Sequence, residues 1–405
     1  MNVANMDRMR VICCVLALLA AAPGVARFRI PEIEQVPVDR LIANLEGELA
    51  QVGSPFDPAE VADIRRKIAR AHALAYARGV TTLPVRAGTN VVQEPPGGPG
   101  FLQSLQDQGQ RIETARYHLL RTLSTYEEIL NADRYDIRSR LGYAWALEQF
   151  GQEQAALEQY RIVAAAAWPV EQDFDSLGGD EGLGLYAGEK TIFQEAATAV
   201  LRYLDPAADA DEIAELETRV AAINEIGRWV TPILVPLDAR DGFHRLVDPQ
   251  ACVAFDLDGS GLARRWGWIT PRAAWLVWDP EGSGHIDSGL QLFGSVGFFI
   301  FWDNGYEALA ALDDDRDGRL EGAELDGLAL WADGNGDGIS DPGEVRPVTS
   351  HGVIAIATGA QEHENGFPYN PAGIELADGA TRASYDWIAR SDAGDCDGKA
   401  SKAGS

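Results

Sequence analysis

The sequence has 405 residues, of which 46% are hydrophobic and 24% charged, a composition typical of a folded protein with two or three domains. Its formal net charge is −28, because 62 acidic residues outnumber 34 Lys and Arg. A phosphate backbone would be repelled by such a chain, so the charge argues against nucleic acid as a partner.

The first residues have the pattern of an export signal. Arg8 and Arg10 precede an apolar run over 11–22, and small residues at 24–26 fit cleavage before Arg27. The run is too short for a transmembrane helix, and no other stretch is suited to span a bilayer. We therefore expect a signal peptide at 1–26 and a secreted or periplasmic protein. An uncleaved membrane anchor is the alternative.

Residues 27–229 have a helical pattern. Asp57-Pro58 is an N-cap followed by proline at the first helical position, and apolar residues then recur at three- and four-residue steps as far as Gly79. A second, long helix is expected over 105–130. Between them, the proline- and glycine-rich stretch 81–100 predicts an extended or mobile linker.

The segment 140–163 reads RLGYAWALEQFGQEQAALEQYRIV. The small Ala144 allows close helix packing, and Gly151 separates two helices. Ala156 and Tyr160 supply a small residue and an aromatic on the second helix. These residues resemble a tetratricopeptide (TPR) repeat. The resemblance implies an N-terminal helical-repeat domain that binds another protein, and an ordinary helical bundle is the alternative.

At Trp229 the composition changes, and we place a domain boundary there. The predicted fold is multidomain α+β, with an all-α, TPR-like domain followed by a mixed domain over 230–391 that carries calcium loops and short strands. A Gly-, Asp- and Ser-rich tail at 392–405 is expected to be disordered. Expected strands lie at 230–237, 251–255 and 353–357, and 380–391 is expected to dock as a last strand or helix.

Two twelve-residue segments of this domain, 313–324 (loop 3) and 333–344 (loop 4), read DDDRDGRLEGAE and DGNGDGISDPGE. Both have oxygen-bearing side chains at alternate positions, glycine at position 6 and glutamate at position 12, which is the EF-hand calcium pattern. The predicted ligands of loop 3 are Asp313, Asp315, Asp317, Glu321 and Glu324, with the carbonyl of Arg319. Those of loop 4 are Asp333, Asn335, Asp337, Asp341 and Glu344, with the carbonyl of Ile339.

Two weaker loops, 256–267 (loop 1) and 279–290 (loop 2), precede them. Neither has glutamate at position 12, where Gly267 and Leu290 stand. An Asp/Gly turn explains loop 1 equally well, whereas Ile286 at position 8 of loop 2 favours a metal site. Their candidate ligands are Asp256, Asp258 and Ser260 in loop 1, and Asp279, Glu281, Ser283 and Asp287 in loop 2.

Acidic residues are concentrated around these loops. Residues 256–344 contain 18 Asp or Glu and five Arg, which is about −13 of the total −28. Carboxylates at alternate positions repel one another unless a hard cation neutralises them. The sequence therefore predicts Ca²⁺ as the bound ion.

The spacing of loops 3 and 4 departs from a usual EF-hand pair. Asp313 and Asp333 are only 20 residues apart, which leaves room for one short helix at about 323–331. Ser340 at position 8 of loop 4 also puts the usual strand pairing between loops in doubt. We therefore expect a compact module stapled by metal, and no opening of the calmodulin kind.

The order of the pieces over 255–346 resembles a calcium-binding segment at the ends of large secreted bacterial proteins. It runs FDLDGSG, GWITPRAAWLVWDPEGSGHID, LFG, NGYEALAALDDDRDGRLEGAE and WADGNGDGISDPGE. One departure is Gln291, where the pattern usually carries an acid. The resemblance implies metal-stabilised folding outside the cell and no enzymatic activity.

Catalytic motifs are not apparent. The six histidines have no zinc-ligand spacing, and there is no G-x-S-x-G elbow or phosphate loop. The alternative function is an envelope carbohydrate-active enzyme with structural calcium, because aromatic platforms beside carboxylates are typical of glycosidases. The tryptophans concerned, which core packing explains better, are Trp266, Trp268, Trp275, Trp278 and Trp302.

Two cysteines, Cys252 and Cys396, remain after the expected signal cleavage. In an oxidising compartment they could pair with each other. Two free thiols are an equal alternative, because the sequence does not place them close together.

Overall fold

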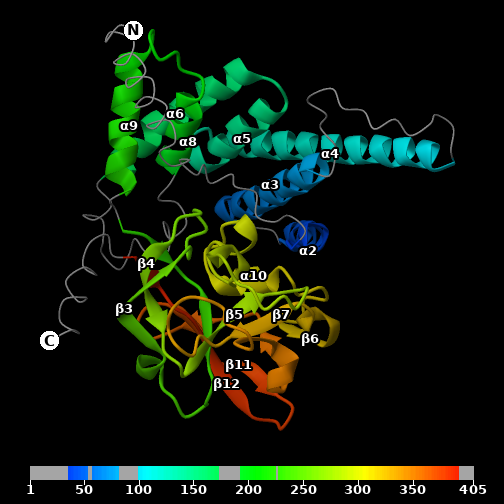
Figure 1. Cartoon of the computed structure of the whole chain (residues 1–405). Helices are drawn as coiled ribbons and strands as arrows, with labels where there is room; N and C mark the ends of the chain where they lie inside the picture. Colours follow the sequence, from blue (N-terminus) through cyan, green and yellow to red (C-terminus); the bar gives the residue numbers. More distant parts are fainter. Residues whose placement is uncertain (1–34, 53–56, 82–98, 173–191, 225–226, 392–405) are drawn as a thin grey trace, which may run out of the picture.

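A computed structural model describes residues 35–52, 57–81, 99–172, 192–224 and 227–391 (Figure 1). The expected signal peptide, the linker from residue 82 to 98 and the expected tail lie outside the described residues. Helices make up the described part before residue 225, and strands with one short helix and several 3-10 turns make up the part that follows, as in a multidomain α+β chain.

Seven helices are described in the N-terminal part. The two expected helices are present: the first begins at Pro58 as expected and continues past Gly79 to Thr81, and the second is longer than 105–130 at both ends. Asp57 caps the first of them, because its Oδ1 accepts a hydrogen bond of 2.9 Å from the N–H of Ala59. The helices are α2 (Val38–Gln51), α3 (Pro58–Thr81), α4 (Pro99–Ala132), α5 (Ile137–Gln149), α6 (Glu153–Glu171), α8 (Ile192–Leu201) and α9 (Ala210–Asn224).

The helical hairpin expected around Gly151 is formed by α5 and α6. Gly151 has a φ of +82°, a left-handed conformation that suits glycine at the end of a helix. Ala144 and Ala156 are fully buried where the two helices meet, and Tyr160 is only 2% exposed. The small residues thus allow the two helices to pack closely.

The C-terminal part is an antiparallel β domain. Its main sheet has the strand order β6-β9-β11-β12-β2-β5-β7-β8, with β10 beside β11, while β3 pairs with β4 and β1 with β13. The strands expected at 230–237, 251–255, 353–357 and within 380–391 are confirmed. The bounds are β1 (Trp229–Val230), β2 (Ile233–Pro236), β3 (Val247–Phe255), β4 (Arg264–Ile269), β5 (Ala273–Trp278), β6 (Arg319–Glu321), β7 (Leu328–Trp331), β8 (Val345–Pro347), β9 (Val353–Ala357), β10 (Gln361–Glu362), β11 (Pro368–Leu376), β12 (Thr381–Asp386) and β13 (Ala389–Arg390).

The prediction of a short helix at 323–331 is wrong. The chain instead makes a 3-10 turn, η4 (Gly322–Leu325), and then strand β7, which pairs with β5 and β8. All four residues of β7 are buried, and they alternate between two cores, Leu328 and Leu330 in one and Ala329 and Trp331 in the other. Burial on both faces with a period of two residues favours a strand.

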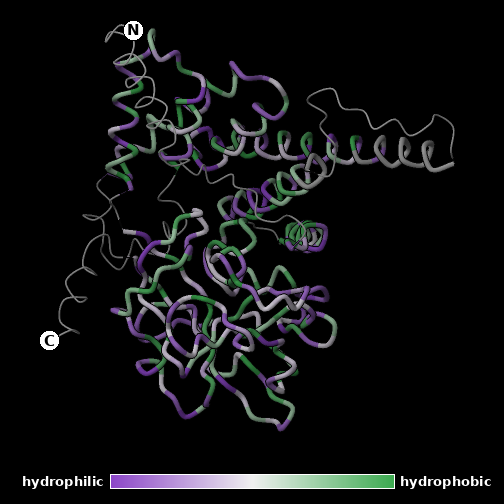
Figure 2. The backbone as a smooth tube through the Cα atoms, viewed as in Figure 1, coloured by the Kyte–Doolittle hydropathy of each residue, from purple (hydrophilic) through white to green (hydrophobic). Residues whose placement is uncertain are grey.

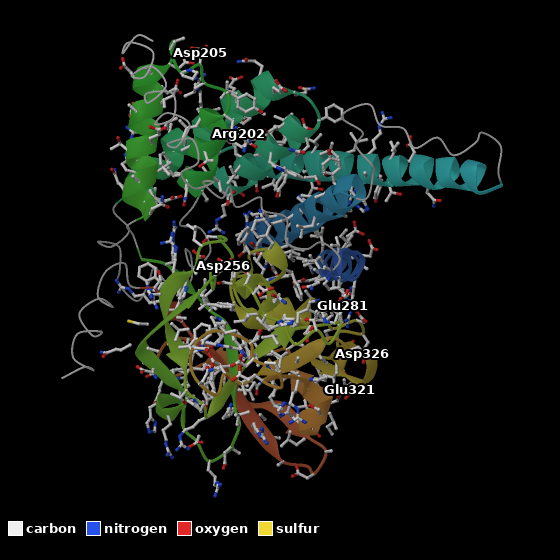
Figure 3. The ribbon with its side chains drawn as sticks, viewed as in Figure 1. Arg202, Asp205, Asp256, Glu281, Glu321 and Asp326 are labelled. Atoms are coloured by element: carbon white, nitrogen blue, oxygen red, sulfur yellow. The ribbon has the colours of Figure 1, made fainter. Side chains whose placement is uncertain are left out.

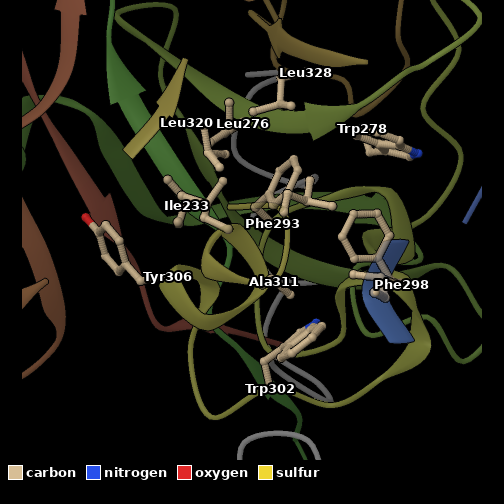
Figure 4. Packing of buried hydrophobic residues seen from close by; sticks show 14 of the residues in the cluster. Ile233, Leu276, Trp278, Phe293, Phe298, Trp302, Tyr306, Ala311, Leu320 and Leu328 are labelled. Carbon is tan, nitrogen blue, oxygen red and sulfur yellow. The ribbon is translucent and has the colours of Figure 1, made fainter. Parts of the chain in front are cut away.

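The main sheet has a hydrophobic core on each face. One core joins the sheet to helices α2 and α3, so that Leu41 and Leu45 of α2 belong to the same cluster as Leu276 and Leu320. Figure 4 shows part of this cluster, with Leu276, Phe293 and Leu320 pointing toward one another. Figure 2 shows α2 close to the β domain, with both hydrophobic and hydrophilic residues along it.

The second core is rich in tryptophan. It contains Trp266, Trp268 and Trp275, which are at most 1% exposed, together with Trp331. Trp278 and Trp302 are buried in the first core. The five tryptophans considered as sugar platforms are therefore core residues, as packing predicted.

Candidate metal centre

Loop 3 follows α10 (Gly305–Ala310), and its second half is formed by β6 and the start of η4. Gly318 at position 6 has a φ of +89°, and its N–H donates to Asp313 Oδ2 over 2.9 Å. Carboxylate oxygens of Asp313, Asp315 and Asp317 all lie within 4.8 Å of one another. Three like charges converge here, which is favourable only with a cation between them.

The first ligand position of loop 3 is buried. Asp313 is 4% exposed, and its Oδ1 has no hydrogen-bond partner among the described residues. A buried carboxylate oxygen without a partner is costly, whereas a bound cation would satisfy it. The residues present therefore fit a calcium ion.

Glu324 closes loop 3 from the far end. Its Oε1 accepts a hydrogen bond of 2.6 Å from the N–H of Asp314, and its Oε2 accepts one of 3.1 Å from the N–H of Glu321. The second bond is half of a capping box that starts η4. Both carboxylate oxygens are thus held in place by the loop backbone.

Loop 4 repeats this closure. Glu344 accepts hydrogen bonds from the N–H of Gly334 at 2.8 Å and of Asp341 at 3.1 Å, the same two positions of the loop. Its first residue, Asp333, is fully buried. Asp333 Oδ2 accepts a hydrogen bond of 2.6 Å from Trp268 Nε1, which ties loop 4 to the tryptophan core.

The middle of loop 4 differs from that of loop 3. Asn335 replaces an aspartate at position 3, and its Nδ2 donates to Asp337 at 3.0 Å and to Asp341 at 3.2 Å. Ile339 at position 7 is 62% exposed, so its side chain points away and leaves its carbonyl as the available oxygen. The amide thus bridges Asp337 and Asp341, whereas no three acids among the described residues of loop 4 come within 4.8 Å of one another as those of loop 3 do.

Loop 1 is built differently. Gly267, at its position 12, lies in β4, where an added Cβ would meet the backbone of Pro249 at 2.9 Å, so no side chain can close the loop from there. Arg264 Nε lies 3.5 Å from Asp258 Oδ2 and supplies a protein cation. Burial, with Asp258 nearby, raises the pKa of Asp256 to about 7. Ser260 is buried beside them, and its Oγ accepts from the N–H of Leu262.

In loop 2 the closing residue stands at position 13 instead of position 12. Asp279 accepts hydrogen bonds from the N–H groups of Ser283 at 2.8 Å and Gly284 at 2.9 Å, as a first ligand residue does. The N–H of Asp287, at position 9, donates to Gln291 Oε1 over 2.9 Å. Gln291 therefore takes the place of the closing glutamate, with an amide where a carboxylate would bind the ion.

Loops 1, 2 and 4 are linked to one another. The N–H of Gly289 donates to the carbonyl of Asp256 at 2.8 Å, and the N–H of Ile286 donates to Ser340 Oγ at 3.0 Å. The latter bond joins position 8 of loop 2 to position 8 of loop 4. Loop 3 instead pairs its strand β6 with β9. Figure 3 labels Asp256, Glu281 and Glu321 from loops 1, 2 and 3.

Comparison with known proteins places this region in a family. Residues 235–388 match the model of the SPM domain. The C-terminal part thus carries an SPM domain, and all four loops fall inside it. The Iron-regulated protein FrpA of Neisseria meningitidis serogroup C is 34% identical over 131 residues. That alignment covers 31% of this chain and 12% of FrpA, so the chain spans a small part of the relative's length.

A second acidic group lies between α3 and the SPM domain. Oxygens of Asp63, Asp303 and Glu307 also lie within 4.8 Å of one another, but Lys67 Nζ is 2.6 Å from both Asp63 and Glu307. Burial by itself lowers the pKa of Lys67, but attraction to the two acids outweighs it, so the pKa of Lys67 is raised. Burial is the larger effect at Glu307 and raises the pKa of that carboxyl. The ammonium group of Lys67 already lies where a metal ion would bind these acids. Only the i,i+4 pair Asp63–Lys67 was readable from the sequence.

A cavity of about 1010 Å³ opens beside this group, between α3, α5 and the loop before α10. Two of its carboxylates, Asp63 and Glu307, bind Lys67, and Asp136 binds Arg66 at 2.9 Å. These acids are held in ion pairs. Tyr135 is the aromatic side chain among the described residues that line the cavity.

No helix in the described ranges has the length and hydrophobicity needed to cross a membrane. Cys252 is disulfide-bonded. The alternative of a free thiol at Cys252 is therefore wrong. Cys396, the other cysteine that remains after the expected signal cleavage, lies outside the described residues.

Proposed function

We propose that the SPM domain of this protein binds calcium ions, with loops 3 and 4 as the main sites and calcium acting as a structural staple. The observation that carries this proposal is the convergence of Asp313, Asp315 and Asp317, together with the buried Oδ1 of Asp313, which has no hydrogen-bond partner among the described residues. When bound, the ion supplies the positive charge that these acids need. Extracellular modules with such loops bind calcium at about 10⁻⁴ to 10⁻³ M.

The residues that hold the ion in loop 3 are Asp313, Asp315, Asp317, Glu321 and Glu324, with the carbonyl of Arg319. The side chain of Arg319 donates from Nη2 to Glu375 over 2.7 Å, and its Nε lies 3.8 Å from Glu321 Oε2. Loop 2 is a third, weaker site. Loop 1 holds a proton or its arginine pair in place of an ion.

Export and a scaffold role complete the proposal. The disulfide at Cys252 suits an oxidising compartment, and the N-terminal residues have the pattern of a signal peptide. The α5–α6 hairpin supports a TPR-like surface that binds another protein. The role is then non-enzymatic, with calcium ordering the domain that accompanies this scaffold.

The test is calcium titration of the full-length chain by calorimetry, with thermal unfolding in calcium and in chelator. Calcium at about 100 times its Kd should stabilise the chain by about 2.7 kcal/mol per site. Glu324→Gln should lose one site, whereas Glu364→Gln, an exposed glutamate outside the loops, should bind like the wild type. An unchanged melting temperature in calcium at about 100 times the expected Kd would contradict the proposal.

A further inference from the structure

Loops 3 and 4 have the same ligand pattern but different residues between the ligands. Positions 2 and 4 of loop 3 are Asp314 and Arg316, whereas the same positions of loop 4 are Gly334 and Gly336. Side chains at these positions point away from the ion in an EF-hand loop. Loop 3 therefore presents the acidic side chain of Asp314 and the basic side chain of Arg316 to the element that packs against its outer side.

Helix α2 packs against that outer side. Arg40 Nε lies 2.8 Å from Asp314 Oδ1, and Asn44 Nδ2 donates to the same oxygen over 2.9 Å. In the other direction, Arg316 Nη2 donates to the carbonyl of Asn44 over 3.2 Å. The guanidinium of Arg316 lies against Gly47, where an added Cβ would be 1.5 Å from Nη2.

The same helix also holds the chain that enters loop 3. Asn44 Nδ2 donates to the carbonyl of Ala311 over 2.9 Å, and Arg40 donates to the carbonyl of Leu312. Leu312, which is fully buried, immediately precedes the first ligand residue, Asp313. Asn44 is itself 9% exposed, so these contacts lie inside the interface.

Apolar packing accompanies the hydrogen bonds. Leu41 and Leu45 of α2 lie in one core cluster with Leu312 and with Leu320, which is position 8 of loop 3. All four are at most 1% exposed. The residue that anchors the second half of the loop therefore packs in a core to which α2 contributes.

Asp314 connects the helix to the closing ligand. Its carboxylate binds Arg40 and Asn44, while its backbone N–H donates to Glu324 Oε1 over 2.6 Å. A loop held in this geometry needs less ordering when the ion binds. Glu344 of loop 4 receives the equivalent bond from Gly334, which has no side chain through which a helix could act.

We infer that α2 is part of the loop 3 cation site, with Arg40 and Asn44 as positioning residues, so that calcium binding and docking of α2 strengthen each other. This inference rests on the proposed calcium binding. Linkage requires that the effect be reciprocal: α2 raises the calcium affinity of loop 3, and calcium in loop 3 stabilises docked α2.

Calorimetric titration of the full-length chain tests the first half. In a Glu344→Gln background, which isolates loop 3, Arg40→Ala with Asn44→Ala should weaken calcium binding about fivefold or more, the lower end of usual coupling. In a Glu324→Gln background, which isolates loop 4, the same pair should leave the affinity unchanged. Equal losses in both backgrounds, or none in either, would overturn the inference.

Hydrogen exchange of the α2 amides tests the second half without altering α2. Calcium should slow their exchange in the wild type and in Glu344→Gln, but not in Glu324→Gln. Slowing that survives Glu324→Gln, or no slowing in the wild type, would count against the inference. If the wild type binds no calcium at all, the proposed function fails as well; if it binds and α2 is unaffected, only the inference fails.

Discussion

Loop 1 and loop 3 both begin with alternating aspartates and a glycine at position 6, yet different groups neutralise those aspartates. In loop 3 the acids face one another, and Glu324 is held ready by two backbone N–H groups. In loop 1 position 12 lies in strand β4, and Arg264 pairs with Asp258. The group that closes the loop therefore decides whether the acids need an external cation or are neutralised by the protein itself.

Loop 4 extends the comparison, because its first ligand is anchored in the core. Trp268→Phe would remove the hydrogen bond to Asp333 and is expected to weaken calcium binding at loop 4 by about 10- to 100-fold, as loss of an outer partner of a metal ligand does. Calcium titration in the Glu324→Gln background measures this site alone.

Trp331→Phe is the matched control for that change. Trp331 is fully buried in the same core, but its Nε1 has no hydrogen-bond partner among the described residues. The two substitutions remove the same volume, so a difference in calcium affinity isolates the hydrogen bond. Similar affinities in the two variants would show that Asp333 needs no anchor.

The raised pKa of Asp256 makes loop 1 sensitive to pH. Its folded pKa of about 7 lies above the ordinary value of 3.8, so without calcium the folded state binds more protons between these values, and stability falls as pH rises through that window. Asp256→Asn should remove this dependence and stabilise the chain at pH 8 by on the order of 2 kcal/mol.

Urea unfolding at several pH values in chelator measures the effect of Asp256→Asn. The control is Asp326→Asn, which makes the same charge change at an exposed position outside the four loops. If Asp256→Asn and the wild type lose stability in parallel as pH rises, loop 1 does not hold its proton near neutral pH.

The smallest expected effect is at loop 2, where a substitution should raise the calcium affinity instead of lowering it. Gln291 already accepts the N–H of Asp287, so Gln291→Glu would place a carboxylate where the loop lacks one. We expect calcium affinity at loop 2 to rise several-fold, because added ligand charge tightens such sites. Gln361→Glu, at an exposed position of β10, adds the same charge elsewhere. Calorimetry should find the additional binding only with Gln291→Glu.

The ligand pattern was predictable because it is local. Asp313 to Glu324 are twelve consecutive residues, and the hydrogen bonds that Asp313 and Glu324 accept from N–H groups inside the loop join residues at most ten positions apart. The helices were predictable for a similar reason, since a cap and a period of three to four residues lie within one segment. Strands β2 and β3 were also expected from short apolar runs.

What the sequence left undecided depends on distant partners. Residues 328–331 read as part of a helix, and only the strands on either side, β5 and β8, make them a strand. Trp268 and Asp333 are 65 residues apart, and Asn44 and Asp314 are 270 apart. The sequence by itself determined which oxygens could bind calcium. The tertiary structure decided what holds them, because burial and long-range hydrogen bonds exist only once the chain has folded.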